Sequence, residues 1–167
     1  MKIETIYKIA SFFMHDVEKN IIEILQEKSN FSSKKELIVF DVGCYRGLFS
    51  QRLNKQLKTK TNKKIKYYLF DPNSKVKQYL KDTLDFEYNY YQIAISKTNG
   101  EKEFYYNPVL EFAMSSLDPK FLKSTLWRIS RSIFSLRKLK YTQRFKVSTD
   151  TIDLFCENNN IPSIIVN

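Results

Sequence analysis

The stretch VFDVGCYRGLFS, residues 39–50, decides the fold of this chain. It begins inside an apolar run, 37–42, that only Asp41 interrupts. Such a run is typical of a strand that is buried on both faces of a parallel sheet. Two of the three glycines of the chain follow at Gly43 and Gly47, where a tight turn is therefore expected. The stretch predicts a strand that turns sharply into a helix, as in open α/β sheets.

The alternation of strands and helices continues after this stretch. The apolar pattern predicts a helix over 48–57 and strands over 65–70 and 88–95. A second helix is expected to run from Ser74, as its cap, to about Leu84. Strands that alternate with helices predict an α/β fold with a parallel, doubly wound, Rossmann-like sheet.

The remainder of the chain predicts shorter elements. A hairpin turn is expected at 98–100, with an extended piece over 103–106 after it. A short helix is predicted over 150–158 and a buried strand at 164–166. Because a strand at the last residues needs further elements to cover it, we expect the sheet to be truncated before its last strands.

The chain divides into an N-terminal part and a main domain. Residues 1–36 are predicted to form an amphipathic helix and a linker, and 37–167 the main domain. About 118–146 is expected to be a basic helical insertion, since no acidic residue follows Asp118 in it. Three alternatives are open for this insertion. One face could pack on the sheet with the lysines in water, or the insertion could contact nucleic acid or lie on an acidic membrane.

Composition limits the partners and the compartment. The chain carries 28 basic and 18 acidic residues, a net charge of +10, which favours anionic partners. Lysine far outnumbers arginine, as in an AT-rich genome, so nucleic acid is the less favoured partner. The two cysteines match no metal spacing and fit a reducing, cytoplasmic compartment. No signal peptide and no apolar run of membrane length is evident.

Two acids stand where predicted strands end. Asp41 can accept hydrogen bonds from amides of the turn or from a ligand amine. Asp71 ends the second predicted strand, because Pro72 cannot continue the ladder. An acid at that position is well placed to bind both hydroxyls of a ribose. Each aspartate alone is also compatible with an ordinary loop, but their joint occurrence favours a nucleoside site.

The chain resembles the FkbM-type methyltransferases, a branch of the class I methyltransferases that use S-adenosyl-L-methionine (SAM). The family looks like V-D-V-G-A-N-x-G at the first turn, where this chain has Cys44 and Tyr45 in place of Ala-Asn. It also carries acid-Pro-Asn, A-x-S-x-x-x-G-x-x-x-F, Ser-Ser-Leu and V-x-T-x-D blocks. The matching residues, in family order, are 39–50, 71–73, 94–104, 115–117 and 147–156.

The resemblance implies SAM as cofactor and methylation of a hydroxyl on a small molecule or a sugar. The implied binding residues are Gly43, Cys44 and Gly47 for the loop, Asp41 for the methionine part, Asp71 and Pro72 for the ribose, and Gln92 and Ile93 for the adenine. No catalytic residue is assigned, because the family's K-I-D-x-E-G-like block would begin after Asn167. A non-catalytic SAM-binding remnant and a nucleic-acid methyltransferase stay open as alternatives.

Overall fold

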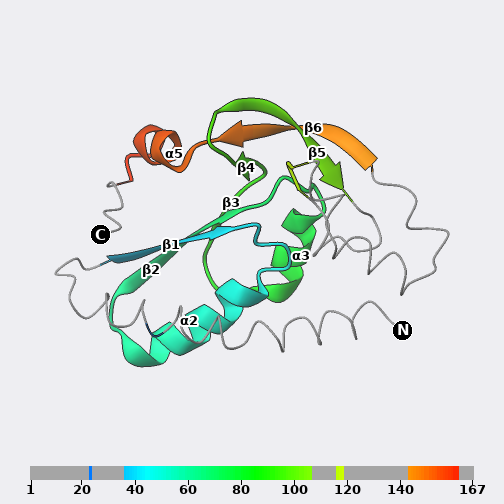
Figure 1. The fold of residues 1–167 in the computed structure, drawn as a ribbon. Helices are drawn as coiled ribbons and strands as arrows, with labels where there is room; N and C mark the ends of the chain where they lie inside the picture. Colours follow the sequence, from blue (N-terminus) through cyan, green and yellow to red (C-terminus); the bar gives the residue numbers. More distant parts are fainter. Residues whose placement is uncertain (1–22, 24–35, 107–115, 119–142, 162–167) are drawn as a thin grey trace, which may run out of the picture. The chain divides into compact units, whose positions relative to one another are not determined.

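A computed structural model describes residues 23, 36–106, 116–118 and 143–161 (Figure 1). These residues form a mixed α/β protein with one parallel and one mixed sheet, each of three strands. They fall into two compact units that divide between Gln92 and Ile93, and each unit has a sheet of its own. Within the described residues, no helix has the length and apolarity needed to cross a membrane.

The sheet of the first unit is parallel throughout. Its strands are β1 (Glu36–Val42), β2 (Lys64–Phe70) and β3 (Asn89–Tyr91), in the order β1-β2-β3. β1 and β2 pair along their whole length, with Val42 opposite Phe70 at their carboxyl ends. Because the strands are parallel, these ends meet at one edge of the sheet.

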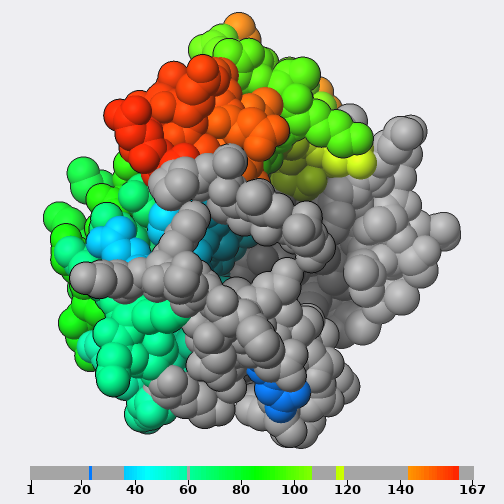
Figure 2. Space-filling view, turned by 90° about the vertical axis from the view of Figure 1, so that its left-hand side faces the viewer, coloured from blue at the N-terminus to red at the C-terminus, as the bar shows by residue number. Residues whose placement is uncertain are grey.

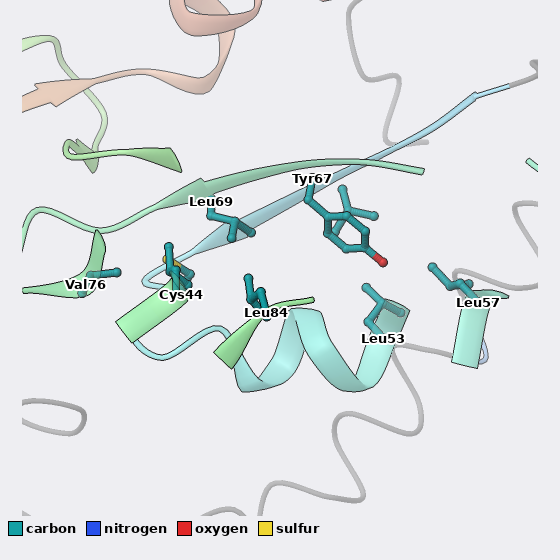
Figure 3. Packing of buried hydrophobic residues seen from close by; sticks show 9 residues of the cluster. Cys44, Leu53, Leu57, Tyr67, Leu69, Val76 and Leu84 are labelled. Atoms are coloured by element: carbon teal, nitrogen blue, oxygen red, sulfur yellow. The ribbon is translucent and has the colours of Figure 1, made fainter. Parts of the chain in front are cut away.

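Two helices, α2 (Leu48–Lys60) and α3 (Val76–Thr83), cover one face of this sheet (Figure 1). Each presents apolar side chains four residues apart, the spacing that places them on one side of a helix. Leu53 and Leu57 of α2 are completely buried. They belong to one hydrophobic cluster (Figure 3), which also contains Val76 and Leu80 of α3 and Val39, Tyr67 and Leu69 of the sheet.

The strand predicted over 88–95 is in fact two short strands in different sheets, so this prediction was wrong. β3 ends at Tyr91, and β4 (Ala94–Ile95) belongs to the second unit. The N–H of Asp71 still donates to the carbonyl oxygen of Tyr91 at 3.3 Å. The next N–H that could face β3 is that of Asn73, and it donates instead to Oδ1 of Asp71 at 2.9 Å. The pairing of β2 with β3 therefore ends at Tyr91.

The second sheet has the order β4-β6-β5, with β5 at Gly100–Tyr106 and β6 at Gln143–Asp150. β6 is parallel to β4 and antiparallel to β5. The hairpin predicted at 98–100 is therefore wrong, because β5 pairs with β6 and not with the strand before it. The strands bury a small core of Ala94, Phe104, Tyr106 and Val147.

The other predicted helices and strands occur in the structure as the predicted type of element, with different end residues. The predictions for β1, β2, α2 and the helix α5 (Ile152–Asn158) are confirmed, and α2 runs three residues beyond its predicted end at Leu57. Ser74 does not cap α3, whose N-cap is Lys75 without a side-chain bond. Instead, the side-chain oxygen of Asn73 accepts the N–H of Lys75 at 3.1 Å.

Several predictions fall wholly or partly outside the described residues. Of the helix and linker predicted over 1–36, two residues are described: Glu23, which is helical, and Glu36, which already belongs to β1. The predicted strand at 164–166 lies outside. The basic insertion predicted as helical over 118–146 is corrected at its end, since residues 143–146 belong to β6. The part of the insertion over 119–142 lies outside the described residues.

Candidate functional site

The predicted site lies at the carboxyl edge of the first sheet. Asp41 is the penultimate residue of β1, and Asp71 follows directly after β2. The turn between β1 and α2, residues 43–47, runs along the same edge, because β1 and β2 end in register. Both aspartates are buried, with 9% and 8% of their surface exposed. The structure therefore brings together two carboxyl groups and the glycine-containing turn, as the sequence predicted.

The backbone amides of the turn are engaged within the protein. The N–H groups of Gly43 and Cys44 both donate to the carbonyl oxygen of Phe70, at 2.8 and 3.2 Å. The N–H of Tyr45 donates to Oδ2 of Asp71 at 3.2 Å, and that of Gly47 donates to the carbonyl oxygen of Cys44 at 2.7 Å. The amides of Gly43, Cys44 and Tyr45 hold the turn against the end of β2, and that of Gly47 closes the turn on itself. All four donate to oxygens of the protein.

Asp41 is held by a residue that the sequence analysis missed. The hydroxyl of Ser50, in the first turn of α2, donates to Oδ2 of Asp41 at 2.6 Å. Ser50 is completely buried, so this bond is shielded from water. A hydrogen bond to a carboxylate in such surroundings is among the stronger ones in proteins. In the sequence, the only indication of this contact was a small hydroxyl residue nine positions after the acid.

Asp71 organises the turn after β2. Its Oδ1 accepts the N–H of Asn73 at 2.9 Å, while Oδ2 accepts that of Tyr45. The phenol of Tyr90, from β3, donates to the carbonyl oxygens of Asp71 at 2.8 Å and Asn73 at 3.2 Å. Burial, followed by the nearby Asp71 carboxylate, raises the pKa of Tyr90, so the phenol stays a donor. Pro72 is buried within this turn.

The two glycines of the turn differ in what surrounds them. Gly43 has a φ of +77° and Gly47 a φ of +70°, a backbone conformation that other residues rarely adopt. A Cβ at Gly47 would lie 2.7 Å from Leu80 and 3.1 Å from Leu84, so this glycine permits close packing on α3. A Cβ at Gly43 would meet nothing within 4 Å. Among the residues that the structure describes, Gly43 is thus a point of the turn that other groups leave open.

The side chain of Cys44 belongs to the core and not to the edge of the sheet. It is 7% exposed and packs in the cluster between the sheet and its helices (Figure 3). Burial raises the pKa of its thiol, and the carboxylates of Asp41 and Asp71 raise that pKa further. The thiol is therefore neutral at physiological pH, and Cys44 takes part in the turn through its backbone N–H and carbonyl oxygen.

Tyr45 occupies a left-handed position in the first turn, where its side chain is held by aromatic and cationic neighbours. Its φ is +44°, in the left-handed region that asparagine tolerates better than tyrosine. Its ring contacts the ring of Tyr79 at 5.6 Å between centroids. The guanidinium of Arg46 lies over both rings, 4.9 Å from Tyr79 and 5.6 Å from Tyr45. These aromatic and cation–π contacts fix the side chains of Tyr45 and Arg46 on Tyr79.

The residues predicted to flank the adenine lie after the end of β3. Gln92 is exposed and follows Tyr91, whose carbonyl oxygen accepts the N–H of Asp71. Ile93 begins the second unit, and its role beside an adenine stays a prediction. Ser116, in the Ser-Ser-Leu block, pairs with Tyr105 of β5, and its hydroxyl accepts the N–H of Asp118 in a turn.

No group of three or more His, Cys, Asp or Glu side chains that could hold a metal ion occurs in the part of the chain that the structure describes. Both cysteines are free and buried. No protein-family model, no curated protein and no solved structure matches this chain.

Proposed function

We propose that this chain is a SAM-dependent methyltransferase of the FkbM type that methylates a hydroxyl of a small molecule or a sugar. The proposal includes a class I, doubly wound Rossmann-like sheet, of which β1-β2-β3 would be one half. Its supports are the resemblance of the sequence blocks and the arrangement of groups at the carboxyl edge of the first sheet. We further propose that the protein is cytoplasmic, as its cysteine usage predicts.

One observation carries the choice of ligand class: two buried carboxyl groups flank a turn whose amides are already bonded. Dinucleotide-binding turns hold a pyrophosphate with amides that point at the ligand. Here the N–H groups of Gly43, Cys44, Tyr45 and Gly47 donate to protein oxygens. SAM carries a cationic sulfonium and an ammonium group. An edge with two carboxyl groups and occupied amides suits such a cation better than it suits a phosphate.

The proposed roles follow from the chemistry of the groups at this edge. The carboxylate of Asp71, which accepts the N–H groups of Tyr45 and Asn73, would also accept the ribose hydroxyls. Asp41, oriented by Ser50, would face the ammonium of the methionine part. The open space at Gly43 would let a ligand approach the backbone. When bound, SAM supplies the methyl group, and these residues bind and orient it for in-line transfer.

The experiment titrates the protein with S-adenosylhomocysteine and with its 2′,3′-dideoxy analogue in a calorimeter. If Asp71 binds the ribose, loss of the two hydroxyls should weaken binding to wild-type protein by about 1–3 kcal/mol. The difference between the two ligands should largely disappear in Asp71→Asn. It should persist in Asp85→Asn, which changes an exposed carboxyl group outside the site.

Two results would count against the proposal. Absence of S-adenosylhomocysteine binding by the wild-type protein would remove the cofactor. A preference for the complete ribose that survives in Asp71→Asn would leave the cofactor but remove Asp71 as its ribose ligand. Binding without methyl transfer to any sugar hydroxyl would support the alternative of a non-catalytic SAM binder.

A further inference from the structure

The charged residues of the first unit are unevenly distributed. No acidic residue occurs between Asp41 and Asp71, whereas lysines recur at the end of α2 and the start of β2. The side chains of Lys55 and Lys58 are exposed on the last turns of α2, and that of Lys64 is exposed on the first residue of β2. We call these three residues the basic end. It forms part of the molecular surface (teal, lower left in Figure 2).

The acid nearest in the sheet, Glu36, is affected by the charge of Lys64 but forms its ion pair with another lysine. Glu36 lies opposite Lys64 in the register but pairs with Lys66, at 2.8 Å. Basic residues at a helix C-terminus interact favourably with the helix dipole, which accounts for lysines in the last turn of α2. It does not account for Lys64, which lies beyond the helix, or for a stretch of this length without an acid.

We propose that the basic end docks on an acidic lipid bilayer. Residues 53–66 contain no arginine and no aromatic residue. Proteins that read nucleic acid use arginine forks on base edges and aromatic rings under bases. An anionic membrane surface requires only exposed point charges, which lysines supply, and each adds to the attraction. The composition of the basic end therefore fits a lipid surface better than RNA or DNA.

The geometry of the first unit determines what such docking leaves accessible. α2 has 13 residues and begins directly after the turn 43–47, so at about 1.5 Å per residue it ends roughly 20 Å away. The basic end lies at the amino end of β2, and the candidate site lies at its carboxyl end. A bilayer bound at the basic end would thus leave the candidate site facing away from the lipid.

The test is co-sedimentation of the full chain with vesicles of phosphatidylcholine alone or with added phosphatidylserine. The wild-type protein is expected to bind only the phosphatidylserine vesicles, and more weakly as salt rises. Lys55→Glu/Lys58→Glu should weaken this binding roughly tenfold or more. The matched control is Lys77→Glu/Lys81→Glu, which makes the same change of charge at exposed positions of α3. Its loss should be several times smaller.

Three outcomes would overturn the proposal. The first is that the wild-type protein does not bind acidic vesicles. The second is an equal loss of binding in both double variants, which would indicate an effect of net charge alone, and the third is tighter binding of an RNA oligonucleotide than of the vesicles at the same salt. Thermal melting of each variant establishes that it is folded. Lys55→Gln/Lys58→Gln replaces the glutamate variant if that one is unstable. S-adenosylhomocysteine should not change vesicle binding, whether or not the proposed methyltransferase function holds.

Discussion

The backbone N–H of Tyr45 and the carboxylate of Asp71 are hydrogen-bonded across the edge of the first sheet, 3.2 Å apart. The bond joins the turn after β1 to the end of β2, residues that are 26 positions apart in the chain. Asp71 thus has a structural task whatever it binds. Any variant of Asp71 must be examined for stability as well as for ligand affinity.

Asp71→Ala is expected to weaken SAM binding by about 1–3 kcal/mol, the range for loss of a charged hydrogen-bond partner. It should also lower the free energy of unfolding, because the N–H groups of Tyr45 and Asn73 lose their acceptor. Calorimetric titration and urea unfolding measure the two effects separately. Unchanged affinity in a protein that is less stable would restrict Asp71 to its structural task. Asp85→Ala is the control.

The two glycines of the turn should respond differently to substitution. Gly43→Val is expected to abolish SAM binding, since its side chain would fill the open space at the turn. The protein should remain folded, with a cost of about 1–2 kcal/mol for the left-handed backbone. Gly47→Val should cost more stability, because its side chain also displaces Leu80 and Leu84.

Thermal unfolding and SAM titration of both variants check this contrast. Gly100→Ala serves as a control for backbone strain alone, since Gly100 has a φ of +122° and a Cβ there would meet nothing within 4 Å. A normal SAM titration with Gly43→Val would remove the first turn from the proposed site. Equal stability of the two valine variants would contradict the packing role of Gly47.

Ser50→Ala is expected to lower the free energy of unfolding by about 1.5–3 kcal/mol, the usual worth of a hydrogen bond to a charged group. The variant removes the donor 2.6 Å from Oδ2 of Asp41 at a fully buried position. Urea unfolding of Ser50→Ala, Asp41→Asn and the double variant measures the coupling. Strictly additive effects in this cycle would show that the two side chains do not depend on each other.

Stability should fall at alkaline pH. Burial raises the pKa of Cys44 above its ordinary value of 9.0 and those of Tyr67 and Tyr90 above 10.0. All three groups are neutral in both folded and unfolded chains below pH 9, so no stability is lost there. Above pH 9 the unfolded chain releases these protons more readily than the folded protein does, and unfolding becomes easier.

Urea unfolding measured from pH 7 to 11 tests this expectation. The loss should begin near pH 9 and become smaller in Cys44→Ala, in which the first of the three groups is absent. Iodoacetamide should leave Cys44 unmodified in the folded protein at pH 8 and alkylate it in urea, because the thiolate is the reactive form. Stability that is constant from pH 8 to 11 would contradict the burial of these groups.

Local patterns in the sequence were sufficient for the first sheet. The apolar run before Gly43 and the four-residue spacing in α2 predict their elements because each depends on near neighbours. The same patterns failed at residues 88–95, where the pairing with β2 ends because the N–H of Asn73 donates to the side chain of Asp71. Periodicity within one segment contains no information about its partner. The failed hairpin at 98–100 has the same cause, since the partner of β5 is distant in sequence.

The candidate site was predicted in part for a similar reason. Asp41 and Asp71 were recognisable because acids at strand ends have a chemical meaning. Ser50 and Tyr90, which hold them, were missed because their contacts exist only after folding. Cys44 was assigned with the turn, but its side chain points into the core, a direction that depends on the left-handed residues on either side of it.

The strand order β4-β6-β5 has a consequence for the time course of folding in the cell. β4 and β5 are synthesised first, yet both pair with β6, which begins at Gln143. At about 5–20 residues per second, the ribosome needs roughly 2 to 7 s to proceed from Tyr106 to that point. During this interval β4 and β5 lack β6, the strand with which both pair, and are exposed to pairing with other chains. The parallel sheet of residues 36–91, by contrast, has all its strands before the second sheet can begin to form.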